Sequence, residues 1–185
     1  MQQGGRWVVV AVLAGLTWRF AKTPLDPGVM DAFLHLPNLM FHEAGHFILM
    51  PFGRFMSVLG GSLLQLLVPL VCAGAFLWQH ADQFGAAVCI WWAGQNLVDL
   101  APYIADARAL QLPLLGGATG AEVEGHDWEY LLEAIGWLHL DVTLGRAAHY
   151  AGSLVMVAAL VWAITLVLRA DDAAASHART SHTGL

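Results

Sequence analysis

The chain has 185 residues, of which 58% are hydrophobic and only 12% are charged, and its mean hydropathy is +0.60. Soluble domains carry about 25% charged residues, so this composition argues against a soluble domain and predicts a membrane protein. The formal net charge is −6, with eight lysines and arginines in total. This leaves no basic surface for nucleic acid, which we therefore exclude as a partner.

The first predicted element is a short membrane helix near the N-terminus. Residues 7–18 form an apolar run between Arg6 and Arg19. A signal peptide has a similar start, but small residues at a cleavage site should follow it, and none do here. We therefore interpret the run as a retained helix that ends at the membrane interface. The Pro- and Gly-containing segment 23–28 then interrupts the chain.

The second predicted element carries the sequence HEAGH at residues 42–46. Pro37 is expected to begin its helix, because proline is favoured in the first helical turn, and Pro51 is expected to end it. At 1.5 Å per residue, a helix over 37–50 is about 21 Å long, shorter than the bilayer core of about 30 Å. We therefore expect a half-buried or re-entrant helix whose polar face is covered by protein.

Three longer segments are each expected to cross a bilayer. Residues 57–78 and 147–168 contain no Asp, Glu, Lys or Arg, and residues 84–104 are similarly apolar except for a few polar side chains such as Gln95 and Asp99. Polar groups at that depth are costly, and they are usually functional or paired within the protein. The small residues that open segment 57–78 predict either a helix-packing notch or a contact with substrate.

The remaining segments are more polar. The connection 105–128 is hydrophilic, and Asp127 is expected to cap a helix over residues 128–140. The tail 170–185 has a composition typical of disorder. The predicted fold class is therefore all-α, with residues 1–169 forming one lipid-embedded domain. We expect a multi-pass integral membrane protein with about four to six membrane-embedded helices.

The sequence HEAGH predicts a zinc site. Residues four apart lie on one face of a helix, so His42 and His46 can both present a ring nitrogen to one metal ion. Two histidine ligands with an adjacent carboxylate and an open coordination position are typical of zinc hydrolases. We therefore predict a Zn²⁺ cofactor bound by His42 and His46, with Glu43 as the catalytic base.

A catalytic zinc ion normally has three protein ligands, so a third residue must join the two histidines. Asp106, after the polar end of segment 84–104, is the favoured candidate, and its competing interpretation is an interfacial carboxylate. His126 is the second candidate. Asp127 and Asp99 are lesser candidates, because Asp127 is also the expected helix cap and Asp99 is expected to act as an outer partner of a ligating histidine.

A family resemblance follows from these residues. The stretch FHEAGHF at residues 41–47, followed by a span that opens with the Gly-Gly pair at 60–61, resembles the site-2 protease family of intramembrane zinc metalloproteases. The resemblance implies that His42 and His46 are ligands and that Glu43 is the base. It also implies a third ligand in a later membrane helix, from an Asp in a segment that contains Asn and Pro.

Asp106 matches that third ligand by position, and Asn96 and Pro102 match the upstream Asn and Pro. The predicted function is therefore a membrane-embedded zinc metalloendopeptidase that cleaves membrane-protein or peptide substrates. The alternative is a non-catalytic membrane protein that keeps the metal site as a structural clip or a partner-binding scaffold. Ala107 supports the alternative, because the family usually has Gly directly after its Asp.

Overall fold

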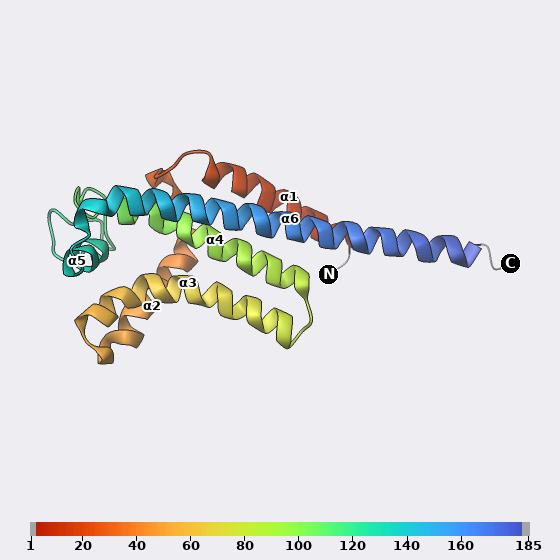
Figure 1. Cartoon of the computed structure of the whole chain (residues 1–185), viewed down its shortest axis with the longest axis horizontal. Coiled ribbons are helices and arrows are strands. Elements are labelled where there is room, and N and C mark those ends of the chain that lie inside the picture. The colour runs from red at the N-terminus through yellow and green to blue at the C-terminus, as the bar shows by residue number, and fades with distance from the viewer. Residues whose placement is uncertain (1–2, 183–185) are drawn as a thin grey trace.

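The computed structural model describes residues 3–182, and this part of the chain contains helices and no strand. The all-α prediction is therefore confirmed. The α-helices are α1 (Gln3–Ala21), α2 (His35–Leu49), α3 (Arg54–Trp78), α4 (Gln83–Ala105), α5 (Asp127–Ala134) and α6 (Asp141–His182). Figure 1 shows an elongated bundle in which α6 runs along the long axis, with the short α5 at one end.

Helix α4 forms the centre of the bundle. Most of its residues are buried, and it packs against α6, α3 and α1. Glycines allow α4 and α6 to approach closely: a Cβ atom on Gly94 would lie 2.8 Å from the carbonyl oxygen of Gly152. A Cβ atom on Gly145 would likewise lie 2.6 Å from the carbonyl oxygen of Ala101. The polar side chains of α4 are therefore enclosed by other helices.

Helices α2 and α3 also cross in backbone contact. A Cβ atom on Gly45 would overlap the carbonyl oxygen of Gly60, so neither position has room for a side chain. This contact supports the packing interpretation of the small residues at the start of α3. The turn between the helices is the 3₁₀ helix η2 (Met50–Phe52), and Gly53 with φ +94° redirects the chain. As a result, the start of α3 lies against the motif-bearing face of α2.

Within residues 3–182, two stretches are long and apolar enough to cross a membrane. They are Arg54–Trp78, with a mean hydropathy of 2.0, and Leu138–Ala174, with a mean hydropathy of 2.4. The sequence predicted four to six membrane-embedded helices, so only part of that expectation is met among residues 3–182. Helix α4, which matches the expected span 84–104, does not pass the same test because of its polar side chains.

The C-terminal helix is longer than expected. Helix α6 has 42 residues and continues from the predicted span 147–168 into the tail that was predicted to be disordered. Alanine has the highest helix propensity, and the alanine-rich sequence after Arg169 extends the helix. Figure 1 shows this part of α6 projecting beyond the other helices. The last three residues of the expected tail lie outside the described residues.

Candidate metal centre

The two histidines of the motif are held by their Nδ1 atoms. His42 Nδ1 lies 3.1 Å from Gln65 Oε1, and His46 Nδ1 lies 2.9 Å from the carbonyl oxygen of Ser57. Both partners belong to α3 and both are acceptors, so each ring carries a proton on Nδ1. The Nε2 atoms are therefore the ones available for a metal ion, and such outer hydrogen bonds are the usual way to orient ligating histidines.

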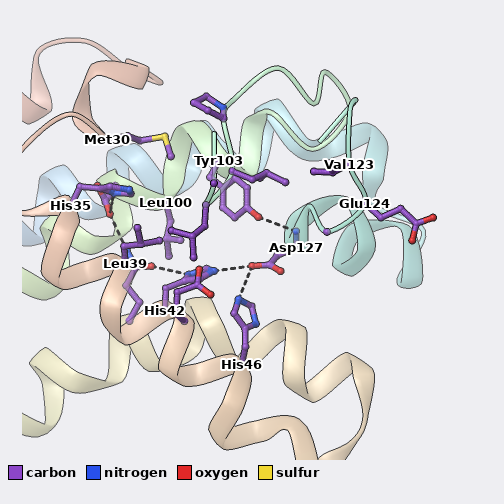
Figure 2. Close-up of a pocket in the computed structure, with 18 of the residues that line it drawn as sticks. Met30, His35, Leu39, His42, His46, Leu100, Tyr103, Val123, Glu124 and Asp127 are labelled. Carbon is purple, nitrogen blue, oxygen red and sulfur yellow. Dashed lines mark hydrogen bonds and ion pairs between the residues drawn. The ribbon is translucent and has the colours of Figure 1, made fainter. Parts of the chain in front are cut away.

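The Nε2 atoms face the carboxylate of Asp127, at the start of α5. Asp127 Oδ2 lies 2.8 Å from His42 Nε2 and 3.2 Å from His46 Nε2 (Figure 2). Ligand atoms of these three residues all lie within 4.8 Å of one another. The two histidines are thus joined by a carboxylate, and the residue that supplies it is Asp127.

This donor set fits a zinc ion. Two ligand atoms of a tetrahedral zinc with bonds of about 2.0–2.1 Å lie roughly 3.3 Å apart, close to the 2.8 and 3.2 Å that separate Asp127 Oδ2 from the two Nε2 atoms. The floor of the site is Gly61, where an added Cβ atom would lie 2.6 Å from both Nε2 atoms. A side chain at this position would press on the ligand atoms, so glycine keeps the space beside them open.

The site attracts positive charge. Without a metal ion, the hydrogen bond to Asp127 raises the pKa of His46 to about 9, although burial acts in the opposite direction, so the ring holds a proton that a bound metal ion would displace. Burial raises the pKa of the Asp127 carboxyl, but hydrogen bonds from His42 and His46 outweigh this effect, so its pKa lies below the ordinary value. Asp127 is therefore ionised at neutral pH, which is the form that binds metal.

Two contacts fix the position of Asp127. Its backbone N–H donates to the hydroxyl of Tyr103 on α4 over 3.0 Å. The preceding residue, His126, caps α5, because its Nδ1 accepts a hydrogen bond of 3.2 Å from the backbone N–H of Glu129. The sequence predicted Asp127 as this cap. The cap lies one residue earlier, and the side chain of Asp127 is left to face the histidines.

The structure does not bring the two favoured candidates for the third ligand to the histidines. The carboxylate of Asp106 accepts hydrogen bonds from the backbone N–H groups of Gln111 and Leu112, at 3.0 and 2.9 Å. His126 Nε2 lies 3.6 Å from Asp106 Oδ2. Neither residue belongs to the group formed with His42 and His46. Instead, Asp106 and His126 lie at the two ends of the connection between α4 and α5, which places Asp127 beside the histidines.

The fourth candidate, Asp99, lies beneath the site. Its carboxylate accepts a hydrogen bond from Gln65, which in turn contacts His42. Asp99 was expected to be an outer partner of a ligating histidine, and it is connected to His42 through one intervening side chain. Sequence reasoning missed Gln65, Tyr103 and the role of Gly61 beside the ligand atoms, because none of them belongs to a pattern that has a fixed spacing from the motif.

A cavity of about 550 Å³ lies beside the three converging residues. Glu43 lines it and is exposed there, so its carboxylate is open to a bound molecule. Apolar side chains such as Leu39, Leu100 and Val123 line part of it, and further polar groups, among them Gln65, Asp99 and Glu124, line the rest (Figure 2). Its volume lies in the range of about 300–1,000 Å³ that is typical of ligand sites.

Comparisons of the chain with protein-family models, with curated proteins and with solved structures found no match. The family resemblance of the FHEAGHF stretch therefore stays a prediction. Whatever function is assigned must come from the chemistry of His42, His46 and Asp127 and of the cavity beside them.

Proposed function

We propose that this chain is a membrane-embedded zinc metallopeptidase that cleaves peptide bonds of membrane-associated substrates, as its resemblance to the site-2 protease family implies. The observation that carries the proposal is the convergence of His42 Nε2, His46 Nε2 and Asp127 Oδ2 beside a cavity that Glu43 lines. Two neutral nitrogen ligands, one carboxylate oxygen and a nearby free carboxylate form the set that zinc hydrolases use.

In this proposal His42, His46 and Asp127 hold the ion. When bound there, zinc supplies Lewis-acid chemistry, which lowers the pKa of a coordinated water toward about 7 and polarises the scissile carbonyl. Glu43 accepts a proton from the water as the water oxygen adds to the carbonyl carbon. It then donates that proton to the nitrogen as the carbon–nitrogen bond breaks, so the products are a carboxylic acid and an amine, which ionise to a carboxylate and an ammonium group by transfer of the remaining acid proton.

The membrane setting of the proposal rests on apolar surface. Besides the two stretches long enough to cross a bilayer, α2 and the turn before it expose large apolar side chains: Phe33 is 81% exposed, Met40 73% and Phe47 74%. Such a surface favours burial in lipid. We propose that α2 enters the membrane on its outer face while its histidines face α3, and that lipid is therefore a partner.

The test is the substitution Glu43→Gln in the purified, detergent-solubilised protein. Hydrolysis of unfolded casein and of fluorescent transmembrane peptides should be lost, because the amide cannot accept a proton, while zinc binding should stay. The matched control is Glu133→Gln, an exposed residue of α5 that does not line the cavity. Glu43→Gln protein that cleaves at the wild-type rate would refute Glu43 as the base. Wild-type protein that binds zinc without cleaving any substrate would instead favour a structural metal site.

A further inference from the structure

A buried hydrogen-bond network begins directly behind the metal centre. Gln65 Oε1 lies 3.1 Å from His42 Nδ1, and Gln65 Nε2 donates to Asp99 Oδ2 over 3.1 Å. Asp99 also accepts from Asn38 Nδ2 over 3.1 Å, and its carboxylate oxygens lie 3.0 and 3.1 Å from His35 Nδ1. Gln65, Asp99 and Asn38 are all at most 3% exposed. The network therefore joins α2, α3 and α4, and Asp99 is connected to His42 through Gln65.

The direction of every hydrogen bond in this network is set by groups that cannot reverse. The indole of Trp92 can only donate, and it donates to Asn38 Oδ1 over 2.8 Å. Asn38 must therefore turn its amide nitrogen the other way, toward Asp99 and toward Gln95 Oε1 at 2.9 Å. An ionised Asp99 can only accept. Because Trp92 donates at one end and Asp99 accepts in the middle, the side-chain amides of the network have a single orientation.

The hydrogen bonds of Asp99 also determine the tautomer of the metal ligand His42. Asp99 requires the Nε2 group of Gln65 as its donor, so Gln65 must present its oxygen to His42. An oxygen at that position accepts a proton from Nδ1 of His42, and this leaves Nε2 of His42 without a proton in the neutral ring. If Asp99 were absent, the amide of Gln65 could rotate by half a turn and present its NH₂ group instead. His42 would then favour the tautomer protonated on Nε2, which cannot bind metal.

We propose that Asp99 is a positioning residue of the metal centre, which acts through Gln65 to hold His42 in the tautomer that carries its proton on Nδ1. The proposal rests on the zinc site of the proposed function and adds to it a determinant of ligand geometry. Asp99 neither binds the ion nor touches substrate in this role. Its effect reaches the metal only through the orientation of one amide.

A double-mutant cycle on zinc affinity tests the route. Asp99→Leu should weaken zinc binding by roughly 10–100-fold, the usual effect of losing an outer hydrogen-bond partner. In the Gln65→Leu background the same change should weaken it by less than about twofold more, because the amide through which Asp99 acts is gone. Asp99→Asn keeps an oxygen that can accept from Gln65, so it should stay within about threefold of the wild type. Equal losses in both backgrounds, or no loss at all, would overturn the proposal.

A second measurement needs no zinc, and its first result needs no change at Asp99. In ¹⁵N-histidine-labelled, zinc-free protein carrying Asp127→Ala, the carboxylate opposite Nε2 is removed, and ring-nitrogen NMR reports the tautomer of neutral His42. The network predicts a proton on Nδ1, and Asp99→Leu in this background should shift the population toward Nε2. A wild-type network that leaves His42 protonated on Nε2 refutes the proposal even if Asp99→Leu does not fold.

The two readouts separate this inference from the proposed function. A chain that binds no zinc but shows His42 protonated on Nδ1, in a manner that depends on Asp99, supports the network and refutes the metallopeptidase. A chain that binds zinc and cleaves peptides, but whose His42 tautomer does not depend on Asp99, supports the metallopeptidase and refutes the role of the network.

Discussion

Asp127 Oδ2 lies 2.8 Å from His42 Nε2, although 85 residues separate them in the chain. One helix supplies both histidines, and the third member arrives from a short helix that begins after the connection following α4. The site therefore exists only when α2, α3 and α5 are packed together. Metal binding to such a site adds its free energy to folding, so zinc should stabilise the whole arrangement.

Gly61 gives a test of the space beside the ligand atoms. An added methyl group would lie 2.6 Å from Nε2 of both His42 and His46. Gly61→Ala should therefore lower zinc affinity by at least about tenfold, comparable to the loss of an outer hydrogen-bond partner. Zinc titration against a chromophoric chelator measures this change.

The matched control for Gly61 is Gly74→Ala in the same helix. There the added atom meets nothing closer than Cζ3 of Trp78 at 3.4 Å, an ordinary contact. This variant should bind zinc like the wild type. Equal affinities for the Gly61 and Gly74 variants would show that the metal does not sit where the two Nε2 atoms meet.

Substitutions of His126 test whether this residue is a helix cap or a metal ligand. Its Nδ1 caps α5, and asparagine is among the best capping residues, so His126→Asn should keep zinc affinity close to the wild type. His126→Ala removes the cap, which costs about 0.5–2 kcal/mol of stability and should weaken zinc binding by at most about thirtyfold. Thermal unfolding and zinc titration report the two effects. A complete loss of zinc in the asparagine variant would instead restore His126 as a ligand.

The crossing of α2 and α3 can be tested through stability alone. Gly45→Ala forces a side chain against the carbonyl of Gly60, and overpacking of this kind costs typically about 1–3 kcal/mol. A lower unfolding midpoint in detergent is expected. Gly15→Ala is the control, since nothing lies within 4 Å of its added atom. That change should leave the free energy of unfolding unchanged or raise it by up to about 1 kcal/mol. Similar midpoints for both variants would argue against the close crossing.

The local parts of this structure could be predicted from the sequence, because local spacing determines them. The positions of His42 and His46 on one helical face follow from a spacing of four residues. The apolar segments likewise predicted the helices, and their ends differ from the structure by a few residues where caps decide them. Helix α6 differs most, because its alanine-rich extension favours helix as strongly as its polar composition favours disorder.

The third member of the site could not be predicted in the same way. Asp106 and Asp127 are both carboxylates near polar helix ends, and local chemistry does not distinguish them. What decides is the path of the connection between them, which depends on hydrogen bonds from Gln111 and Leu112 to Asp106 and from Asp127 to Tyr103. These contacts join segments that are distant in the chain, so no spacing in the sequence indicates them.

Zinc X-ray absorption on a cysteine variant shows directly whether residue 127 completes the proposed zinc site. A thiolate bound to zinc gives a scatterer at about 2.3 Å, distinct from nitrogen or oxygen at about 2.0–2.2 Å. The zinc-loaded Asp127→Cys protein should show one sulfur at that distance, while the wild type and Asp106→Cys should show none. Sulfur in the Asp106→Cys spectrum and none in the Asp127→Cys spectrum would show that residue 106, and not residue 127, binds the ion.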